Sequence, residues 1–466
     1  MIHHSVIYRD AFGNAEMREV WAESSMVQRW LDVEAAIALA ESEVKIIPRR
    51  VAATIAKHCN VGTITPEAIA KWYTKTGHVI VSMVKAFRDV VPEDGELFHY
   101  GPTTQDILDT GLTLQIRDAL CVLIPALEKL IDIVIARAVQ HKKTVMAGRS
   151  EGQIASPITF GYKLAVLATE LADHLERLAQ CSERLLWLSL FGAVGVQSSF
   201  CQLSSVKVAQ TLTRLVGERL KLRVPPVCVH HRTDRFGELG TVIAGLVSTL
   251  GETGLEIRDL QRSEVGEVSE PWDSDRHSSS TMPQKQNPEM SEWLEGLASL
   301  SRAYAISLLD IQQQHERDIT RLPAELEALP NLFLHAIAAI HYASLVYDGL
   351  RVFPDRMLSN LTANGNVIMS EAVMLLLAAR SKRKVWAHQL CHNIALSVSE
   401  RGGDLVASMS KNEEVLKYLS PQEIRAAADP ARYIGTAWEQ VDASVAVCKK
   451  KQAKAAKIFA RTVFCA

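Results

Sequence analysis

The chain has 466 residues and carries 51 Lys and Arg against 53 Asp and Glu, so its net charge is −2. This balance argues against a protein that binds nucleic acid or an anionic membrane, because such proteins carry a basic excess. The length suggests about three domains, and 48% hydrophobic with 22% charged residues is typical of a globular protein. Only 24 glycines and 16 prolines occur, which favours long helices with few turns.

The eight cysteines are scattered and include no CxxC pair. They indicate reduced thiols of a cytoplasmic protein, and no metal-ligand spacing appears. The N-terminal stretch MIHHSVIYRDAF lacks the apolar core of a signal peptide. The most apolar window, residues 332–347, contains two histidines and is short for a bilayer span, so we expect a buried helix and no membrane association.

Apolar residues recur at helical spacing over residues 15–42, which predicts one helix there. Proline and glycine then cluster up to a break near residue 103. From residue 104 to 140 the helical pattern is almost continuous apart from Pro125. Leucines at three- and four-residue spacing predict another long helix over 158–190, and no strand alternation of useful length competes with these helices.

Further long helices are predicted over 235–264 and 291–350, separated by a polar loop at 265–290. A loop of this length inside a helical body is usually functional. A second break falls at 352–354, before shorter helices and a basic final helix whose lysine run, 449–457, is expected to face solvent. We therefore expect an N-terminal helical domain (1–103), a central long-helix domain (104–353) and a C-terminal helical domain (354–466).

The segment from Ser278 to Pro288, SSSTMPQKQNP, carries the most chemistry. Serine hydroxyls, a lysine ammonium and an asparagine amide suit the binding of a carboxylate and removal of a proton beside it. The alternative interpretation is a flexible polar linker.

This segment resembles the signature loop of the fumarase/aspartase superfamily, whose pattern is GSSxMPxKxNP, with Ser278 where glycine is usual. FHYGPTTQDILDT (98–110), MAGRSEGQIASPITFGYK (146–163) and HERDITRLPAELEALP (315–330) resemble further segments of that family. Within it, residues 12–48 are most similar to 3-carboxy-cis,cis-muconate cycloisomerases, and the adenylosuccinate lyases are the other near branch.

The resemblance implies an all-α, three-domain subunit whose long helices join in the central bundle of a homotetramer. It also implies active sites built from three subunits, a small dicarboxylate or tricarboxylate substrate, and no metal or other cofactor.

The resemblance also implies roles for individual residues, and Ser279 matches the serine that acts as the base. Lys285 and Asn287 match groups that stabilise the dianion formed when the proton leaves. Thr103, Thr104 and Gln153 match positions that hold substrate carboxylates. The remaining substrate-binding candidates are Met282 and Ser280 in the signature loop, His78, and two arginines that could clamp a carboxylate, Arg18 and Arg317.

The sequence offers several candidates for the group that protonates the leaving group. His99 matches an active-site histidine of the family, and His230, His231 and His315 could line the same cleft. The family's R-T-H segment reads Arg149-Ser150-Glu151 here, so the usual histidine is absent. Glu151 could be a general acid kept protonated by burial, the leaving group could need no proton, or Glu151 could be a structural carboxylate at a helix N-terminus.

These features predict a lyase that removes a β-proton from a substituted succinate and expels an amine or oxygen leaving group, giving fumarate or a fumarate-like product. The alternative is a cycloisomerase that forms or opens a lactone. Adenylosuccinate is a less favoured substrate, because Leu322-Pro323-Ala324-Glu325-Leu326 replaces the S-S-x-E-R stretch that the resemblance assigns to a nucleotide phosphate. A non-catalytic scaffold is the hypothesis from another class.

Overall fold

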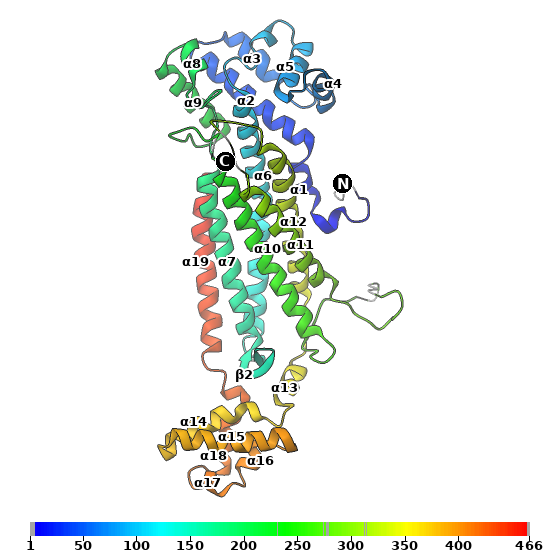
Figure 1. Cartoon of the computed structure of the whole chain (residues 1–466), viewed down its shortest axis with the longest axis vertical. Coiled ribbons are helices and arrows are strands. Elements are labelled where there is room, and N and C mark those ends of the chain that lie inside the picture. Colours follow the sequence, from blue (N-terminus) through cyan, green and yellow to red (C-terminus); the bar gives the residue numbers. More distant parts are fainter. Residues whose placement is uncertain are drawn as a thin grey trace.

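Long helices run side by side through the middle of the subunit, which is elongated along their direction (Figure 1). The computed structural model describes residues 5–230, 232–273, 275, 279–311, 313 and 315–463. The bundle helices are α6 (Thr104–Gln140), α7 (Phe160–Leu185), α10 (Asp234–Gln261), α11 (Glu289–Leu309), α12 (Leu322–Gly349) and α19 (Ala437–Thr462). The all-α fold class is confirmed.

Shorter helices cover both ends of the bundle (Figure 1). Those at one end are α1 (Ala15–Val20), α2 (Glu23–Glu43), α3 (Arg49–His58), α4 (Pro66–Thr76), α5 (Val79–Val90), α8 (Ser198–Leu203) and α9 (Val206–Leu220). Those after the bundle's other end are α13 (Pro354–Thr362), α14 (Ser370–Ser381), α15 (Lys384–Arg401), α16 (Leu405–Met409), α17 (Glu413–Leu416) and α18 (Pro421–Ala427). Strands β1 (Val145–Ser150) and β2 (Gln153–Thr159) pair antiparallel, as do β3 (Val268–Ser269) and β4 (Arg351–Val352).

Helices α10 and α11 pack closely against each other, and small residues allow their approach. A Cβ added to Gly254 would lie 2.5 Å from the carbonyl oxygen of Ser291, and one added to Gly251 would lie 2.7 Å from the Cβ of Ala298. Both distances are too short for real atoms, so glycine is required for this packing. The signature loop (residues 265–290) runs into the first residues of α11, so this contact also sets where the loop ends.

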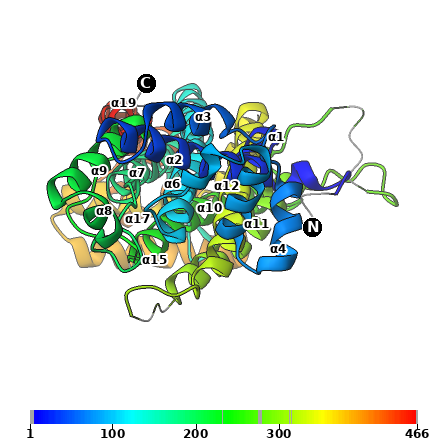
Figure 2. The same cartoon turned by 90° about the horizontal axis from the view of Figure 1, so that it is seen from above.

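The last helix, α19, leaves the C-terminal group of helices and packs along α7 in the bundle (Figures 1 and 2). Its basic residues face acids of α7: Lys451 pairs with Asp173, and Lys454 lies 2.5 Å from Glu176. The lysine run is therefore partly an interhelical contact, which corrects the expectation of a purely solvated face. The division into domains at 103/104 and 353/354 stays a prediction, but residues 437–462 pack with the central helices.

Three predicted helices differ from the structure. The helical pattern predicted over 291–350 corresponds to two helices, α11 and α12, with residues 310–321 between them. Residues 15–42 form α1 and α2 with a break at Trp21 and Ala22, because Ala22 is extended, with ψ of 149°. The helix expected over 158–190 is α7, which begins at Phe160 and ends at Leu185, and a β-hairpin precedes it. Thr159 ends the hairpin and caps α7, since its side chain accepts a hydrogen bond from the backbone N–H of Tyr162.

Helix α12 is the one continuous helix in the described part of the chain that is long and apolar enough to cross a membrane. Of its most apolar window, 67% is buried inside the subunit, against α6, α10 and α11. A bent pair, 354–362 with 367–381, passes the same test of length and composition when taken together. The expectation that residues 332–347 form a buried helix is confirmed.

The first turns of α6 are held by buried charges. The Asp106 carboxylate accepts hydrogen bonds from the backbone N–H of Thr103 at 2.8 Å and of Phe191 at 2.7 Å. Its Oδ1 also lies 3.0 Å from Nε2 of His230, and both side chains are fully buried. One turn further, Asp109 pairs with Arg321 at the start of α12. These contacts join the start of α6 to three segments that are distant in sequence.

Burial by itself lowers the pKa of His230, but the hydrogen bond and charge of Asp106 outweigh it and raise that pKa to about 9. The folded-state pKa therefore lies above the ordinary value of 6.5. A histidine with a raised pKa stabilises the fold fully below its unfolded value, and this stability is lost as the pH rises through about 9.

We predict that the free energy of unfolding falls between pH 6.5 and pH 9.5 and that His230 accounts for roughly 3 kcal/mol of the fall, the linkage value of its pKa shift. The measurement is denaturant unfolding of the wild type and of His230→Asn across this range. The exposed His388→Asn variant should keep the wild-type slope. A wild-type advantage over His230→Asn that is constant with pH would contradict the buried imidazolium–carboxylate pair.

Candidate active site

Several predicted site residues gather where α6 begins. Thr103 precedes the helix and Thr104 is its first residue. The Thr104 hydroxyl oxygen lies 3.4 Å from Nε2 of His78, which itself caps the start of α5. Arg317 donates a hydrogen bond from Nη1 to the Thr103 hydroxyl at 2.9 Å. The structure therefore brings together four candidates from three distant parts of the chain.

His99 belongs to the same end of the bundle and is oriented by a buried carboxylate that the sequence did not reveal. Its Nδ1 lies 2.6 Å from Oε1 of Glu34 on α2, and the two side chains are 18% and 1% exposed. Burial alone lowers the pKa of His99, but the charge and hydrogen bond of Glu34 and the charge of Asp106 outweigh it and raise that pKa. Because Nδ1 faces Glu34, Nε2 is the nitrogen that can exchange a proton with a substrate.

The signature loop presents its serine in a tight turn. The Ser279 Oγ accepts hydrogen bonds from the backbone N–H groups of Met282, at 2.9 Å, and Thr281, at 3.4 Å. Donors of this kind stabilise negative charge on the oxygen that they face. Lys285 follows in the same turn, with its backbone N–H donating to the Met282 carbonyl at 3.1 Å. Ser278, the departure from the family pattern, lies outside the described residues.

Two buried glutamates at the first end of the signature loop tie it to the hairpin and to α11. Glu267 is fully buried and forms a two-armed ion pair with Arg149 of β1, at 2.6 and 3.0 Å. Glu270 accepts hydrogen bonds from the backbone N–H and the hydroxyl of Ser291, both at 2.8 Å, at the start of α11. A carboxylate at this position satisfies the unpaired first-turn N–H groups and the helix dipole. The spacing E-V-G-E-V-S-E of residues 264–270 is the only sequence signal for these anchors.

Arg351 on β4 links the two ends of the loop. Its Nη2 donates to the Ser269 hydroxyl and to the Gln286 side-chain oxygen, each at 2.5 Å. Gln261 makes a second link, because its amide accepts from the backbone N–H of Glu270 and donates to the carbonyl of Gln286. The loop therefore leaves and rejoins the subunit at nearly the same place, and Ser279, Met282 and Lys285 lie between these anchors.

Glu151 and Gln153 lie on the hairpin at the opposite end of the bundle (Figure 1). Glu151 and Gly152 form its two-residue turn, with φ values of 55° and 74°. Positive φ at both positions is typical of a type I′ turn. Both Glu151 and Gln153 are exposed in the single subunit. The interpretation of Glu151 as a structural carboxylate at a helix N-terminus is therefore wrong.

The remaining candidates lie elsewhere. The Arg18 guanidinium holds the N-terminal segment, donating to the carbonyls of Arg9 and Gly13 and pairing with Asp10. His230 is buried against Asp106, His315 lies in the segment between α11 and α12, and His231 lies outside the described residues.

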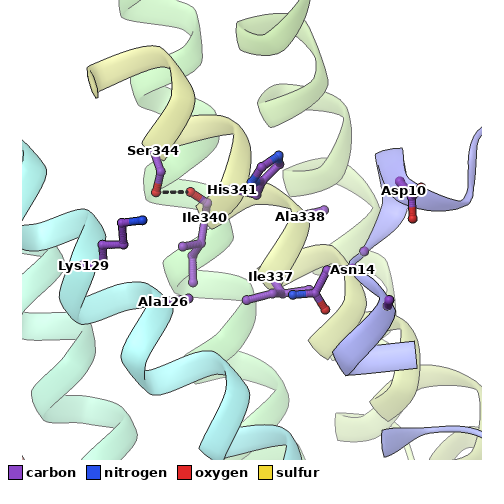
Figure 3. Close-up of a pocket in the computed structure, with 11 residues that line it drawn as sticks. Asp10, Asn14, Ala126, Lys129, Ile337, Ala338, Ile340, His341 and Ser344 are labelled. Atoms are coloured by element: carbon purple, nitrogen blue, oxygen red, sulfur yellow. Dashed lines mark hydrogen bonds between the residues drawn. The ribbon is translucent and has the colours of Figure 1, made fainter. Parts of the chain in front are cut away.

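A pocket of about 320 Å³ between the N-terminal segment, α6 and α12 contains none of the predicted site residues (Figure 3). Asp10 and Asn14 border it on one side, and Lys129 and His341 border it on others (Figure 3). Arg18 does not line this pocket, but it pairs with Asp10, which does. Arg18 therefore helps to hold the N-terminal segment that forms one side of the pocket.

The predicted groups therefore occupy three separate places on one subunit. Thr104 is the first residue of α6 and Glu151 lies beyond its last residue, and the 37 residues of this helix span about 55 Å at 1.5 Å per residue. The signature loop projects from the side of the bundle, before α11 (Figures 1 and 2). A single small substrate cannot contact all three places within one chain.

Comparison with known proteins supports the fold and identifies the family. Residues 12–300 match the family model described as lyase, and residues 366–444 match the model described as adenylosuccinate lyase C-terminus. The N-acetyl-S-(2-succino)cysteine lyase of Dickeya dadantii is 35% identical over 436 residues, which cover 92% of this chain and 94% of that one. The adenylosuccinate lyase of Pyrococcus abyssi is 36% identical over 446 residues, covering 95% and 97%.

The crystal structure of 3-carboxy-cis,cis-muconate lactonizing enzyme from Pseudomonas putida has the same fold. It superposes with a TM-score of 0.88 at 31% identity, covering 96% of this chain and all of that one. The lyase model spans more than half of the chain and the relatives match nearly all of it, so this chain belongs to the fumarase/aspartase superfamily of lyases.

Proposed function

We propose that this enzyme catalyses β-elimination from a substituted succinate, releasing fumarate or a fumarate-like product. The observation that carries the proposal is the turn of the signature loop, in which two backbone N–H groups face the Ser279 oxygen. These donors lower the cost of the negative charge that a serine needs in order to act as a base. Membership of the lyase superfamily supports the same reaction.

In the proposed reaction, Ser279 takes the proton from the carbon next to a carboxylate. The electron pair of that C–H bond delocalises onto the carboxylate, and Lys285 and Asn287 of the same loop stabilise the resulting dianion. The pair then forms the C=C bond while the bond to the leaving group breaks with its electrons. Thr103, Thr104 and Gln153 hold the carboxylates, and Arg317 supports Thr103 through their hydrogen bond.

We further propose that each active site combines residues of different subunits of a homotetramer. The separation of the three groups along one subunit supports such an arrangement for a small substrate. Exposed apolar side chains on the bundle support association, among them Leu300 (43% exposed), Ile306 (62%) and Leu309 (60%) on α11 and Val166 (53%) on α7. Exposed apolar surface of this kind is typical of protein–protein contacts. The proposed location of the enzyme is the cytoplasm.

The leaving group is proposed to be a thiol or an amine. The Dickeya relative is named for a succinylated thiol and the Pyrococcus relative for a succinylated nucleotide amine. Leu322, Pro323 and Leu326 stand where the resemblance places the phosphate-binding residues, which argues against adenylosuccinate for this chain. For a leaving group that needs a proton, we propose Glu151 as the donor, supplied by a neighbouring subunit.

The second candidate function is lactone formation or opening by a cycloisomerase. It is favoured by the similarity to the Pseudomonas putida lactonizing enzyme and by the absence of a histidine at position 150 or 151. A carboxylate that leaves within a lactone needs no proton donor. Ultraviolet absorbance of the alkene, with succinylated thiols and amines compared with carboxymuconate, separates the two functions.

We predict that Ser279→Ala lowers kcat by about 100- to 10,000-fold, the usual contribution of a general base. Binding of fumarate and the melting temperature should stay close to wild type, because the serine is only half-buried and its role is in the proton transfer. The assay is alkene absorbance with N-acetyl-S-(2-succino)cysteine, and the exposed Ser397→Ala is the control. A near-normal rate in Ser279→Ala would remove this serine from the mechanism.

We predict that Glu151→Gln lowers kcat most for substrates with an amine leaving group, because an amine departs poorly without a proton. The measurement is kcat of the wild type and the variant with succinylated amines compared with succinylated thiols. The exposed Glu400→Gln serves as the matched control. If Glu151→Gln keeps the wild-type kcat with both kinds of substrate, the leaving group departs without help from this residue.

We predict that two inactive variants restore activity when their subunits mix. Ser279→Ala and His99→Asn each disable one of the separated groups, so in mixed tetramers about a quarter of the sites should receive both intact groups. The measurement is the rate after joint refolding, with subunit exchange verified by native mass spectrometry. Exchange without recovery of activity would mean that the two groups come from the same chain.

A further inference from the structure

A second cavity, of about 340 Å³, opens beside His78 and Thr104. Helices α2, α4, α5 and α6 and the start of α12 enclose it. The 3.4 Å contact between the two polar side chains lies at its border. The cavity is therefore continuous with the group of residues to which we assign a substrate carboxylate.

The walls of this cavity are largely apolar. Trp30 and Met26 contribute from α2, Ile69 from α4, Leu108 from α6 and Leu322 from α12. Glu23 is the one charged side chain among the residues that line it. A phosphate or carboxylate placed here would lose its hydration without meeting a cation, which is strongly unfavourable.

The rim of the cavity is apolar and open to solvent. Ile319 is 73% exposed, Leu326 is 52% exposed and Tyr73 is 50% exposed, and all three line the opening. Exposed apolar residues around a concave site mark a place where an apolar group binds. The cavity is also large enough for such a group, since a cavity of about 150 Å³ already accepts benzene.

We propose that this cavity receives the leaving group of the substrate and that this group ends in an uncharged aliphatic or aromatic moiety. The inference rests on the proposed elimination, in which the bond that breaks joins the succinyl half to the leaving group. With the succinyl carboxylate at Thr104, the leaving group extends past His78 into the apolar cavity. The substrate class is thus a succinyl thioether or amine with an apolar end.

The test is a series of S-(2-succinyl) thioethers with methyl, propyl, pentyl and benzyl groups, together with a 2-phosphoethyl analogue. If the cavity buries the chain, kcat/KM should rise about fourfold for each added methylene until the cavity is full. The phosphoethyl compound should fall below the methyl compound. Equal kcat/KM along the alkyl series, or a preference for the phosphoethyl compound, would overturn the proposal.

A variant at the rim tests the location. Leu326→Lys places a cation at an exposed position where folding tolerates it, and it should lower the benzyl-to-methyl ratio of kcat/KM at least tenfold while raising the relative rate of the phosphoethyl compound. Leu375→Lys, at a 46% exposed leucine on α14 outside the cavity, should keep the wild-type ratio. An unchanged ratio in Leu326→Lys would place the apolar selectivity elsewhere and overturn the assignment.

Equilibrium binding separates this inference from the proposed function. Benzyl mercaptan and 2-mercaptoethyl phosphate are titrated into wild type, Leu326→Lys and Trp30→Phe, with tryptophan fluorescence as the readout, because Trp30 lines the cavity. Tighter binding of benzyl mercaptan that is lost in Leu326→Lys supports the apolar cavity. If such binding is seen but neither the thioethers nor the matching succinyl amines are turned over, the proposed elimination is wrong and the cavity assignment holds. If the thioethers are turned over but benzyl mercaptan does not bind preferentially, the assignment of the cavity to the leaving group is wrong, whereas the proposed elimination is supported.

Discussion

Two buried aspartates in the first turns of α6 hold the end of the subunit where Thr103, Thr104 and Arg317 meet. Asp106 binds backbone N–H groups on both sides of it in sequence and pairs with His230. Asp109 pairs with Arg321, the residue that directly precedes α12. Charges removed from water need such partners, since an unpaired buried charge costs several kcal/mol. The positions of Thr104 and of the apolar cavity beside it therefore depend on these carboxylates.

The signature loop is held at its two ends. Its candidate catalytic residues, Ser279 and Lys285, lie between these attachment points. Glu267 and Glu270 tie one end to the hairpin and to α11, and Arg351 joins that end to Gln286 near the other end of the loop. The loop is thereby displayed outside the bundle of its own subunit. In an oligomer, this arrangement offers Ser279 and Lys285 to a site completed by other subunits, which is the arrangement that we propose.

Much of the helical architecture could be predicted because it depends on the spacing of apolar residues that are close together in the chain. The helix over 104–140 and the helix predicted over 235–264, observed at 234–261, follow from their apolar repeats, and the loop motif identified the superfamily. Predicting helices from apolar spacing failed at Trp21 and Ala22, because the helical spacing of apolar residues continues through the break between α1 and α2. It also failed before α7, where the structure has a short β-hairpin. The turn at Glu151 is one such case, because its conformation depends on positive φ values that no hydrophobic pattern encodes.

By itself, the sequence determined the helical class, the long helices and the loop that carries Ser279, because periodicity and motifs depend on residues close together in the chain. Only the tertiary structure decided which groups meet. The contacts of Glu34 with His99, of Glu267 with Arg149 and of Arg317 with Thr103 join residues 65, 118 and 214 positions apart. Such pairs arise from helix packing, and no local pattern specifies which distant side chain a buried charge will face.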